Sequence, residues 1–108
     1  MDKQIGLFEA IDTQRALRYI KPDPIPSEML DRILLAASKA PSGGNNQPWE
    51  FVIIQDQGVK DQIATFYKQA WDDSYGKATD PGRLGTHSYN SAEHLASHIA
   101  EAPLWIII

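Results

Sequence analysis

The 108-residue sequence predicts one domain that combines α-helices with β-strands. Four segments carry apolar residues at helical spacing, and two short runs are rich in β-branched and aromatic residues. Hydrophobic residues make up 43% of the chain and charged residues 22%, which is typical of a soluble globular protein. A chain of this length can bury a core without disulfides or metal. We therefore expect a mixed fold of helices and strands.

The first expected helix runs from Ile5 to Leu17, where apolar side chains form an imperfect helical stripe. Near its end, Arg15 and Arg18 are three residues apart, so they can share one face and converge on a phosphate. Two solvated arginines on an amphipathic segment would give the same spacing, and both interpretations stay open. The proline-rich run Lys21–Pro26 follows, and it predicts a stiff, extended connector because proline cannot continue a helix.

The second helix is expected to begin at Ser27, whose side chain can cap it, and to end after Lys39, where Pro41 stops it. Its apolar residues follow the i, i+3, i+4, i+7 pattern at Leu30, Ile33, Leu34 and Ala37. After Pro48, the β-branched and aromatic content of Trp49–Ile54 predicts a largely buried strand.

The rest of the chain predicts two more helices and a second strand. Helical spacing predicts a helix over Gly58–Trp71, and Ser91 can cap a last helix that runs to Ala100. Between them, Asp72–Asn90 is polar and rich in turn-forming residues, which predicts a long loop of the kind that often serves as a functional lid. Leu104–Ile108 predicts a buried strand that stops at the last residue without a turn or a tail. We therefore expect residues 1–108 to form the N-terminal portion of a single domain.

Charge and composition argue against several kinds of partner. The formal net charge is -4, whereas a protein that binds phosphate backbones normally presents a basic face, so we expect no nucleic-acid partner. The chain has no cysteine, which excludes thiol nucleophiles, disulfides and thiolate metal sites. The N-terminus lacks the pattern of a signal peptide, and the longest apolar run is too short to cross a bilayer. We therefore expect a cytoplasmic protein with no membrane partner.

The connection APSGGNNQPW, residues 40–49, is the most unusual segment of the sequence. Four successive residues, Gly43 to Asn46, are of types that tolerate a positive φ angle, which is more freedom than one turn needs. The segment follows a helix and precedes a strand, so it is neither a P-loop nor a Rossmann fingerprint. Asn45, Asn46 and Gln47 place three side-chain amides in succession, which suits the alternating donors and acceptors of a heterocycle such as a flavin. A simple helix cap and turn is the alternative.

Other possible chemistry finds little support in the sequence. His94 and His98 are four residues apart but lack the glutamate of the H-E-x-x-H motif, so we expect a helix surface and no metal site. Ser42 does not lie in a G-x-S-x-G motif, and no catalytic triad can be assembled around His87. We therefore expect no catalytic side chain of the hydrolase type.

Taken together, these segments resemble the N-terminal half of the FMN-dependent nitroreductase family. The resemblance is carried by Arg15-Ala16-Leu17-Arg18, the KPDPIP connector, the helix from Met29 to Ala40, PSGGNNQPWEFVII and EAPLWIII. It implies an α+β flavoprotein fold with a mixed central sheet flanked by helices. It also implies a homodimer with flavin at the subunit interface and electron transfer from NAD(P)H through FMN to nitroaromatic, quinone or related acceptors. Because the flavin carries the redox chemistry, no catalytic side chain is expected.

The resemblance also assigns cofactor-binding residues. Arg15 and Arg18 match positions that grip the flavin phosphate, where Ala16 contributes its backbone. Pro41, Ser42 and Gly43 match the loop that lies against the ring of the partner subunit's flavin, and Asn45 and Gln47 match polar positions near the ring or the ribityl chain.

Two positions depart from the family pattern, and other functions stay open. Many members have an arginine and a serine where this chain has Gln14 and Ala16, which removes a charge and a hydroxyl from the phosphate end. A non-catalytic flavin-binding or interaction protein is one alternative. A relative that dehalogenates its substrate or modifies the flavin is another.

Overall fold

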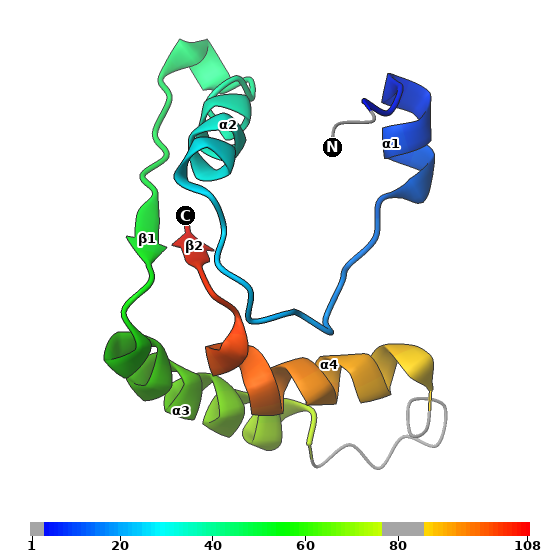
Figure 1. Cartoon of the computed structure of the whole chain (residues 1–108), viewed down its shortest axis with the longest axis vertical. Helices are drawn as coiled ribbons and strands as arrows, with labels where there is room; N and C mark the ends of the chain where they lie inside the picture. Colours follow the sequence, from blue (N-terminus) through cyan, green and yellow to red (C-terminus); the bar gives the residue numbers. More distant parts are fainter. Residues whose placement is uncertain (1–3, 77–85) are drawn as a thin grey trace.

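The computed structural model describes residues 4–76 and 86–108, which form helices around one small sheet (Figure 1). The helices are α1 (Leu7–Thr13), α2 (Ser27–Ala37), α3 (Gln57–Ser74) and α4 (His87–His98). Two short 3-10 turns, η1 (Gly43–Asn45) and η2 (Ile99–Glu101), follow α2 and α4, and the strands are β1 (Val52–Ile54) and β2 (Trp105–Ile107). Within the described part of the chain, no helix combines the length and the apolar character that a bilayer-spanning helix requires.

The sheet joins two segments that are far apart in the sequence. β1 and β2 are antiparallel, and Val52 pairs with Ile107 and Ile54 with Trp105. Both strands consist of β-branched and aromatic residues, which pack well on a pleated surface. The pairing closes the chain end back onto the segment that follows η1.

α3, α4 and η2 pack together. Lys60 on α3 is only 3% exposed, and its Nζ donates a hydrogen bond of 2.9 Å to the carbonyl oxygen of Ala102. The indole Nε1 of Trp105 donates a bond of 3.1 Å to the carbonyl of Ile99. These long side chains satisfy the carbonyl groups where α4 and η2 end, so the sheet is held to the helices.

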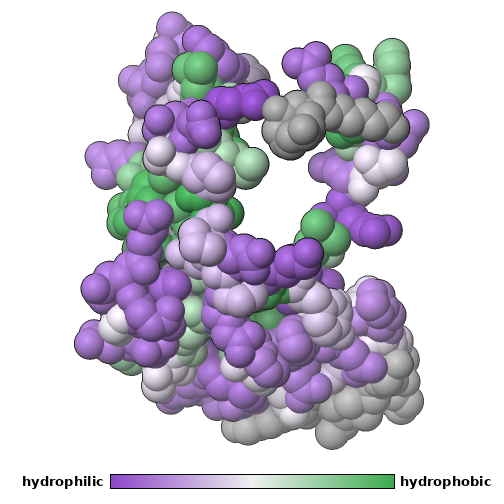
Figure 2. Space-filling view, viewed as in Figure 1, coloured by the Kyte–Doolittle hydropathy of each residue, from purple (hydrophilic) through white to green (hydrophobic). Residues whose placement is uncertain are grey.

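The molecule is much more open than a compact monomer. Its exposed surface is 8655 Å² and its radius of gyration 16.7 Å, whereas a compact chain of 12.1 kDa exposes about 6,000 Å² and has a radius near 13 Å. α1 stands at the end of an extended segment, away from the other helices (Figure 1), and its Leu7 and Phe8 are 70% and 77% exposed. Figure 2 shows hydrophobic side chains on α1 and over the two strands, with an open space between these parts.

The first helix is shorter than the sequence predicts. It ends at Thr13, and Gln14 already has extended backbone angles, so Arg15 and Arg18 lie on an extended segment and not near a helix end. Helix propensity alone does not determine where this helix ends, because most helical stability comes from packing. The apolar stripe of α1 has no packing partner in the described chain, and the segment that follows extends toward α4.

Two predicted N-caps are also wrong. Pro26 occupies the N-cap position of α2, and Ser27 is the first helical residue and makes no capping hydrogen bond. Thr86 caps α4 by accepting a bond of 3.2 Å from the amide of Tyr89, so Ser91 lies inside the helix. Before α4 the local sequence offers several hydroxyl groups, and the backbone geometry selects Thr86 as the cap.

The strands are shorter and the third helix is longer than expected. The predicted strands Trp49–Ile54 and Leu104–Ile108 reduce to three residues each. They are half-exposed where burial was expected, because the described sheet has only these two strands. Asp56 caps α3 through its Oδ1 and the amide of Val59 at 2.9 Å, and the helix continues through Ser74. The loop predicted over Asp72–Asn90 therefore begins later and ends earlier, and its central part, 77–85, lies outside the described residues.

Candidate functional site

A pocket of about 680 Å³ lies between the extended segment and the start of α4. Its described walls come from two stretches of the chain that are some seventy residues apart, namely Arg15, Ala16, Leu17, Arg18 and Tyr19 on one side and His87, Ser88 and Ser91 on the other. The pocket therefore contains all three of the residues that the sequence assigns to a phosphate group. Figure 1 shows the extended segment passing over α4.

Arg18 is held in this pocket by hydrogen bonds that reach into α4. Its NH1 donates a bond of 3.1 Å to the Oγ of Ser91, which is only 5% exposed. The hydroxyl of Ser91 in turn donates a bond of 3.1 Å to the carbonyl oxygen of Ser88. Arginine has five N–H donors, so this arrangement leaves most of the guanidinium of Arg18 available to a ligand.

The described residues place no carboxylate in an ion pair with the arginines of the pocket. In the part of the chain that the structure describes, neither Arg15 nor Arg18 forms an ion pair, and the one salt bridge joins Lys68 to Asp72 on α3. Arg15 is exposed and Arg18 is half-buried. Two guanidinium groups without a carboxylate partner among the described residues lie beside Ser88 and the first turns of a helix, and they match the donors that a phosphate group requires.

A stack of three rings keeps the extended segment against α4. The ring of Tyr19 lies 4.3 Å from that of His94, and the ring of His94 lies 4.1 Å from that of His98. The Nδ1 of His98 lies 2.8 Å from the carbonyl oxygen of His94. No cluster of three metal-ligating side chains occurs among the residues described, and these two histidines contribute to the packing of the segment.

The loop after α2 has the left-handed backbone that its sequence predicts. Gly44 has φ 59°, Asn45 54° and Gln47 49°, so the freedom is used, although Gly43 and Asn46 keep negative φ. The amide of Gln47 donates a bond of 2.9 Å to the Oγ of Ser42, and its Nε2 donates one of 3.0 Å to the Oδ1 of Asn45. The side chains of this loop therefore hold its own shape.

The outer surface of the loop is open. A Cβ atom placed on Gly43 or Gly44 would meet no other atom within 4 Å, so neither glycine is required by packing inside the chain. Pro41, Ser42, Gly43, Asn45 and Gln47 are exposed or half-exposed, and a flat ligand could reach the backbone here without displacing protein atoms.

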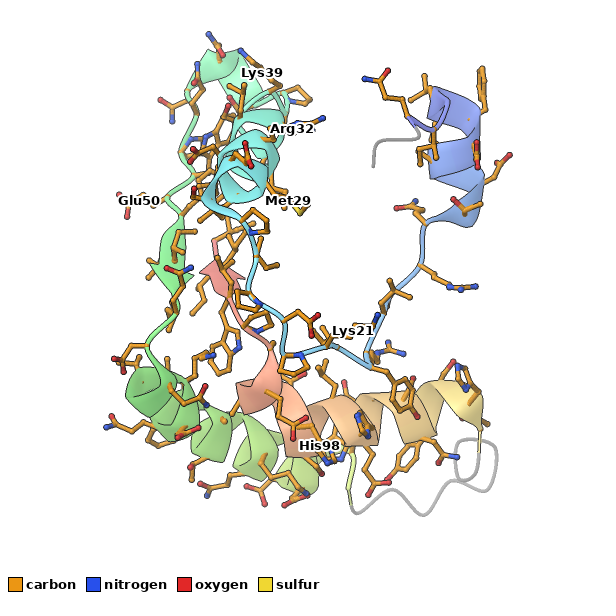
Figure 3. All side chains as sticks on the ribbon, viewed as in Figure 1. Lys21, Met29, Arg32, Lys39, Glu50 and His98 are labelled. Carbon is orange, nitrogen blue, oxygen red and sulfur yellow. The ribbon has the colours of Figure 1, made fainter. Side chains whose placement is uncertain are left out.

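The structure does not bring the arginine pocket and the loop together within one chain. None of the five loop residues lines the pocket. Figure 3 marks the separation, because Lys39, just before the loop, and Lys21, just after Arg18, lie on different sides of the open space. The eight residues assigned from the sequence thus form two separate groups in one chain.

Sequence reasoning missed the α4 side of the pocket. The sequence does not indicate Ser88 and Ser91 as ligand-binding residues, because its pattern predicts that Ser91 caps a helix and that the segment before it is a loop. The available signal was Thr86, which offers an alternative cap and would have placed both serines on one face of the first turns of a helix.

Comparison with known proteins agrees with this architecture. The sequence model of the nitroreductase family matches residues 11–108. Similar curated proteins include iodotyrosine deiodinase of Danio rerio, 31% identical over 75 residues, which covers 69% of this chain and 25% of that protein. Iodotyrosine deiodinase 1 of Rattus norvegicus is 29% identical over 107 residues, which covers 94% of this chain and 35% of the relative. The chain thus spans about a quarter to a third of the length of these relatives.

A solved structure shows the same fold. It is a crystal structure of oxidized iodotyrosine deiodinase bound to FMN and 3-iodo-L-tyrosine, with a TM-score of 0.72 and 24% sequence identity. The match covers 94% of this chain and 54% of that one. The fold is therefore the α+β fold of the nitroreductases, as the sequence predicts.

Proposed function

The chain belongs to the nitroreductase family, and from this premise we propose that it is part of an FMN-dependent oxidoreductase that passes electrons from NAD(P)H to small acceptors. Bound FMN would supply the redox chemistry, since flavins accept a hydride and hand on electrons. The acceptors we propose are nitroaromatics, quinones and related compounds. The protein's own part is to bind the flavin, orient it and shape the space beside its ring.

The observation that carries this proposal is the arginine pocket. Arg15 and Arg18 face a space of about 680 Å³ and lack carboxylate partners among the described residues. Their donors fit the phosphate of FMN, and Ala16 offers its backbone between them. Ser88, which lines the same pocket, offers a hydroxyl in place of the one absent at Ala16, whereas no further arginine or lysine lines the described pocket in place of the charge absent at Gln14.

The separation of the two groups of residues supports a homodimer. We propose that Arg15, Ala16 and Arg18 hold the flavin phosphate, while Pro41, Ser42, Gly43, Asn45 and Gln47 of the other subunit approach the ring and ribityl chain. The chain exposes roughly 2,600 Å² more than a compact monomer of its mass. That excess is larger than the ~800 Å² that each partner buries in a standard interface.

Reductive dehalogenation is a second candidate function. It is favoured by the names of the similar proteins, which are iodotyrosine deiodinases. The described part of the region between α3 and α4 is aromatic, with Trp71 lying 5.2 Å from Tyr75 and 5.6 Å from Tyr89, measured between ring centroids. An aromatic substrate could pack there, whether it carries a nitro group or a halogen.

The test begins with the purified chain. It should be yellow, release FMN that mass spectrometry identifies, and bind added FMN more tightly than riboflavin. NAD(P)H oxidation should then be stimulated by nitrofurazone or menadione, and 3-iodotyrosine distinguishes the dehalogenase. A folded chain that does not take up FMN would overturn the proposal, and flavin binding without any acceptor-dependent turnover would favour the non-catalytic alternative.

A further inference from the structure

Ser91 is the buried polar residue of the arginine pocket, and helix geometry alone does not require it there. Its side chain is 5% exposed and lies in the second turn of α4. If the hydroxyl of a helical serine needed only a hydrogen-bond partner, a bond to a carbonyl of the preceding turn would suffice. Thr65 on α3 makes such a bond to the carbonyl of Asp61 at 3.1 Å. Ser91 makes such a bond to Ser88 and also accepts one from Arg18, 73 residues away in the sequence.

We propose that Ser91 is a positioning residue that orients Arg18 for the phosphate of the flavin, and that it thereby favours FMN over riboflavin. This inference rests on the proposed function. Ser91 itself need not touch the cofactor, because its oxygen is already engaged by Arg18 and its hydrogen by the carbonyl of Ser88.

The direction of these hydrogen bonds explains how the positioning works. The carbonyl of Ser88 fixes the hydroxyl hydrogen of Ser91, so the lone pairs of Ser91 point away from α4 and can accept from NH1 of Arg18. A guanidinium held at one nitrogen has fewer rotamers to lose when a phosphate binds to its remaining donors. The extended backbone at Arg18 supplies no helical packing of its own, so among the described hydrogen bonds the one to Ser91 limits the side chain.

A simpler possibility is that the bond only ties the extended segment to the helix. The stack of Tyr19 on His94 at 4.3 Å already provides a tie one residue away, and it does not require the hydroxyl of Ser91. The two roles differ in what they predict. If the bond only attaches the extended segment to α4, its loss should weaken the binding of every flavin and lower the stability of the fold. If it orients Arg18, its loss should weaken only the binding of ligands that carry a phosphate.

The experiment compares Ser91→Ala, Arg18→Ala and the double variant of the full chain, with Kd values for FMN and riboflavin measured by quenching of flavin fluorescence. Ser91→Ala should weaken FMN binding about tenfold and leave riboflavin binding unchanged, because the loss acts through a hydrogen bond to a charged group. In the Arg18→Ala background the same change should have no further effect. Thr65→Ala, which removes a comparable intrahelical hydroxyl on α3, should leave both flavins unaffected.

A measurement without flavin separates this inference from the proposed function. The Nε–H signal of Arg18 in a ¹⁵N NMR spectrum should shift in Ser91→Ala, because the guanidinium loses its acceptor, while that of Arg32 should not move. If the wild type binds FMN and Ser91→Ala binds it equally well, or loses FMN and riboflavin alike, the positioning role is overturned and the proposed function stands. If the wild type binds no FMN, the proposed function fails, and with it the phosphate role of Ser91, even where the NMR shift occurs.

Discussion

The arginine pocket and the glycine loop are built in opposite ways. In the pocket, Arg18 is fixed by Ser91 across 73 positions of sequence, and the contact is partly buried. In the loop, every described side-chain bond spans at most five positions and is exposed, as in the bond from Gln47 to Ser42. The pocket therefore depends on tertiary structure, whereas the loop carries its shape in its own backbone.

The pocket and the loop are therefore suited to different parts of a ligand. A site held by long-range contacts can place a charge in a defined position, which suits recognition of one charged group. A loop held by its own bonds can present a flat backbone surface independently of the rest of the chain, which suits contact with a planar ring from another subunit. Variants in the two regions should therefore separate FMN from riboflavin in one case and not in the other.

The largest effect is expected for Arg18→Ala. Removing a guanidinium that bonds a phosphate should raise the Kd for FMN about 30-fold, or about 2 kcal/mol. Riboflavin has no phosphate, so its Kd should stay the same, and isothermal titration with both flavins measures the contrast. Arg32→Ala removes the same charge from the exposed surface of α2 and should change neither Kd. Equal losses for FMN and riboflavin would contradict the phosphate assignment.

The next effect concerns the loop. Gly43→Ala adds a methyl group that meets no atom of its own chain, and Gly43 has no positive φ angle, so the melting temperature should not change. If the backbone lies flat against a flavin ring, the methyl group would separate them, and we expect binding of FMN and riboflavin to weaken alike by about tenfold, or 1.4 kcal/mol. Unchanged affinity for both flavins would show that the loop does not contact the ring.

The loop, which is held by local bonds, could be predicted from the sequence better than the pocket, which is held by long-range contacts. The positive φ angles at Gly44 and Asn45 follow from local residue types, so two of the four positions from Gly43 to Asn46 use the freedom that the sequence predicts. The helical stripe of α2 and the β-branched runs likewise located a helix and two strands. Gln47 at φ 49° was not anticipated, because glutamine has no special tolerance for that region and depends on its bonds to Ser42 and Asn45.

The pocket was only half anticipated, for a physical reason. Residue type indicated that Arg15 and Arg18 could hold a phosphate, but nothing in their neighbourhood indicated the partner in α4. Ser91 has the same local pattern as a helix cap, and only the position of Thr86 at the true N-cap excludes that role. Local propensity also predicts a helix through Leu17, but α1 ends at Thr13. The segment after it is extended, and Arg18 there bonds to Ser91 of α4.

A smaller effect is expected for Gly44→Ala, which tests the backbone of the loop without adding a clash. Its φ of 59° is strained for alanine, and no atom lies within 4 Å of the added Cβ, so the cost comes from the backbone alone. We expect a loss of about 1 kcal/mol in the free energy of unfolding, which thermal unfolding would register as a decrease of about 5 °C. Gly44→Asn should lose less, because asparagine tolerates this conformation. A larger loss for Gly44→Asn than for Gly44→Ala would mean that side-chain volume matters more than φ.

The smallest effect is expected for Ser42→Ala, and it tests whether the loop is indeed held by its own bonds. The hydroxyl of Ser42 accepts from the amide of Gln47 at 2.9 Å, and this bond helps to keep Gln47 at φ 49°. Because the bond is exposed, water can replace it, so the free energy of unfolding should fall by only about 0.5 kcal/mol. Gln47→Gly removes the backbone strain at that position, and in this background the loss caused by Ser42→Ala should shrink. Urea unfolding of the four chains gives the coupling, and purely additive losses would indicate that Ser42 acts elsewhere than on the backbone of Gln47.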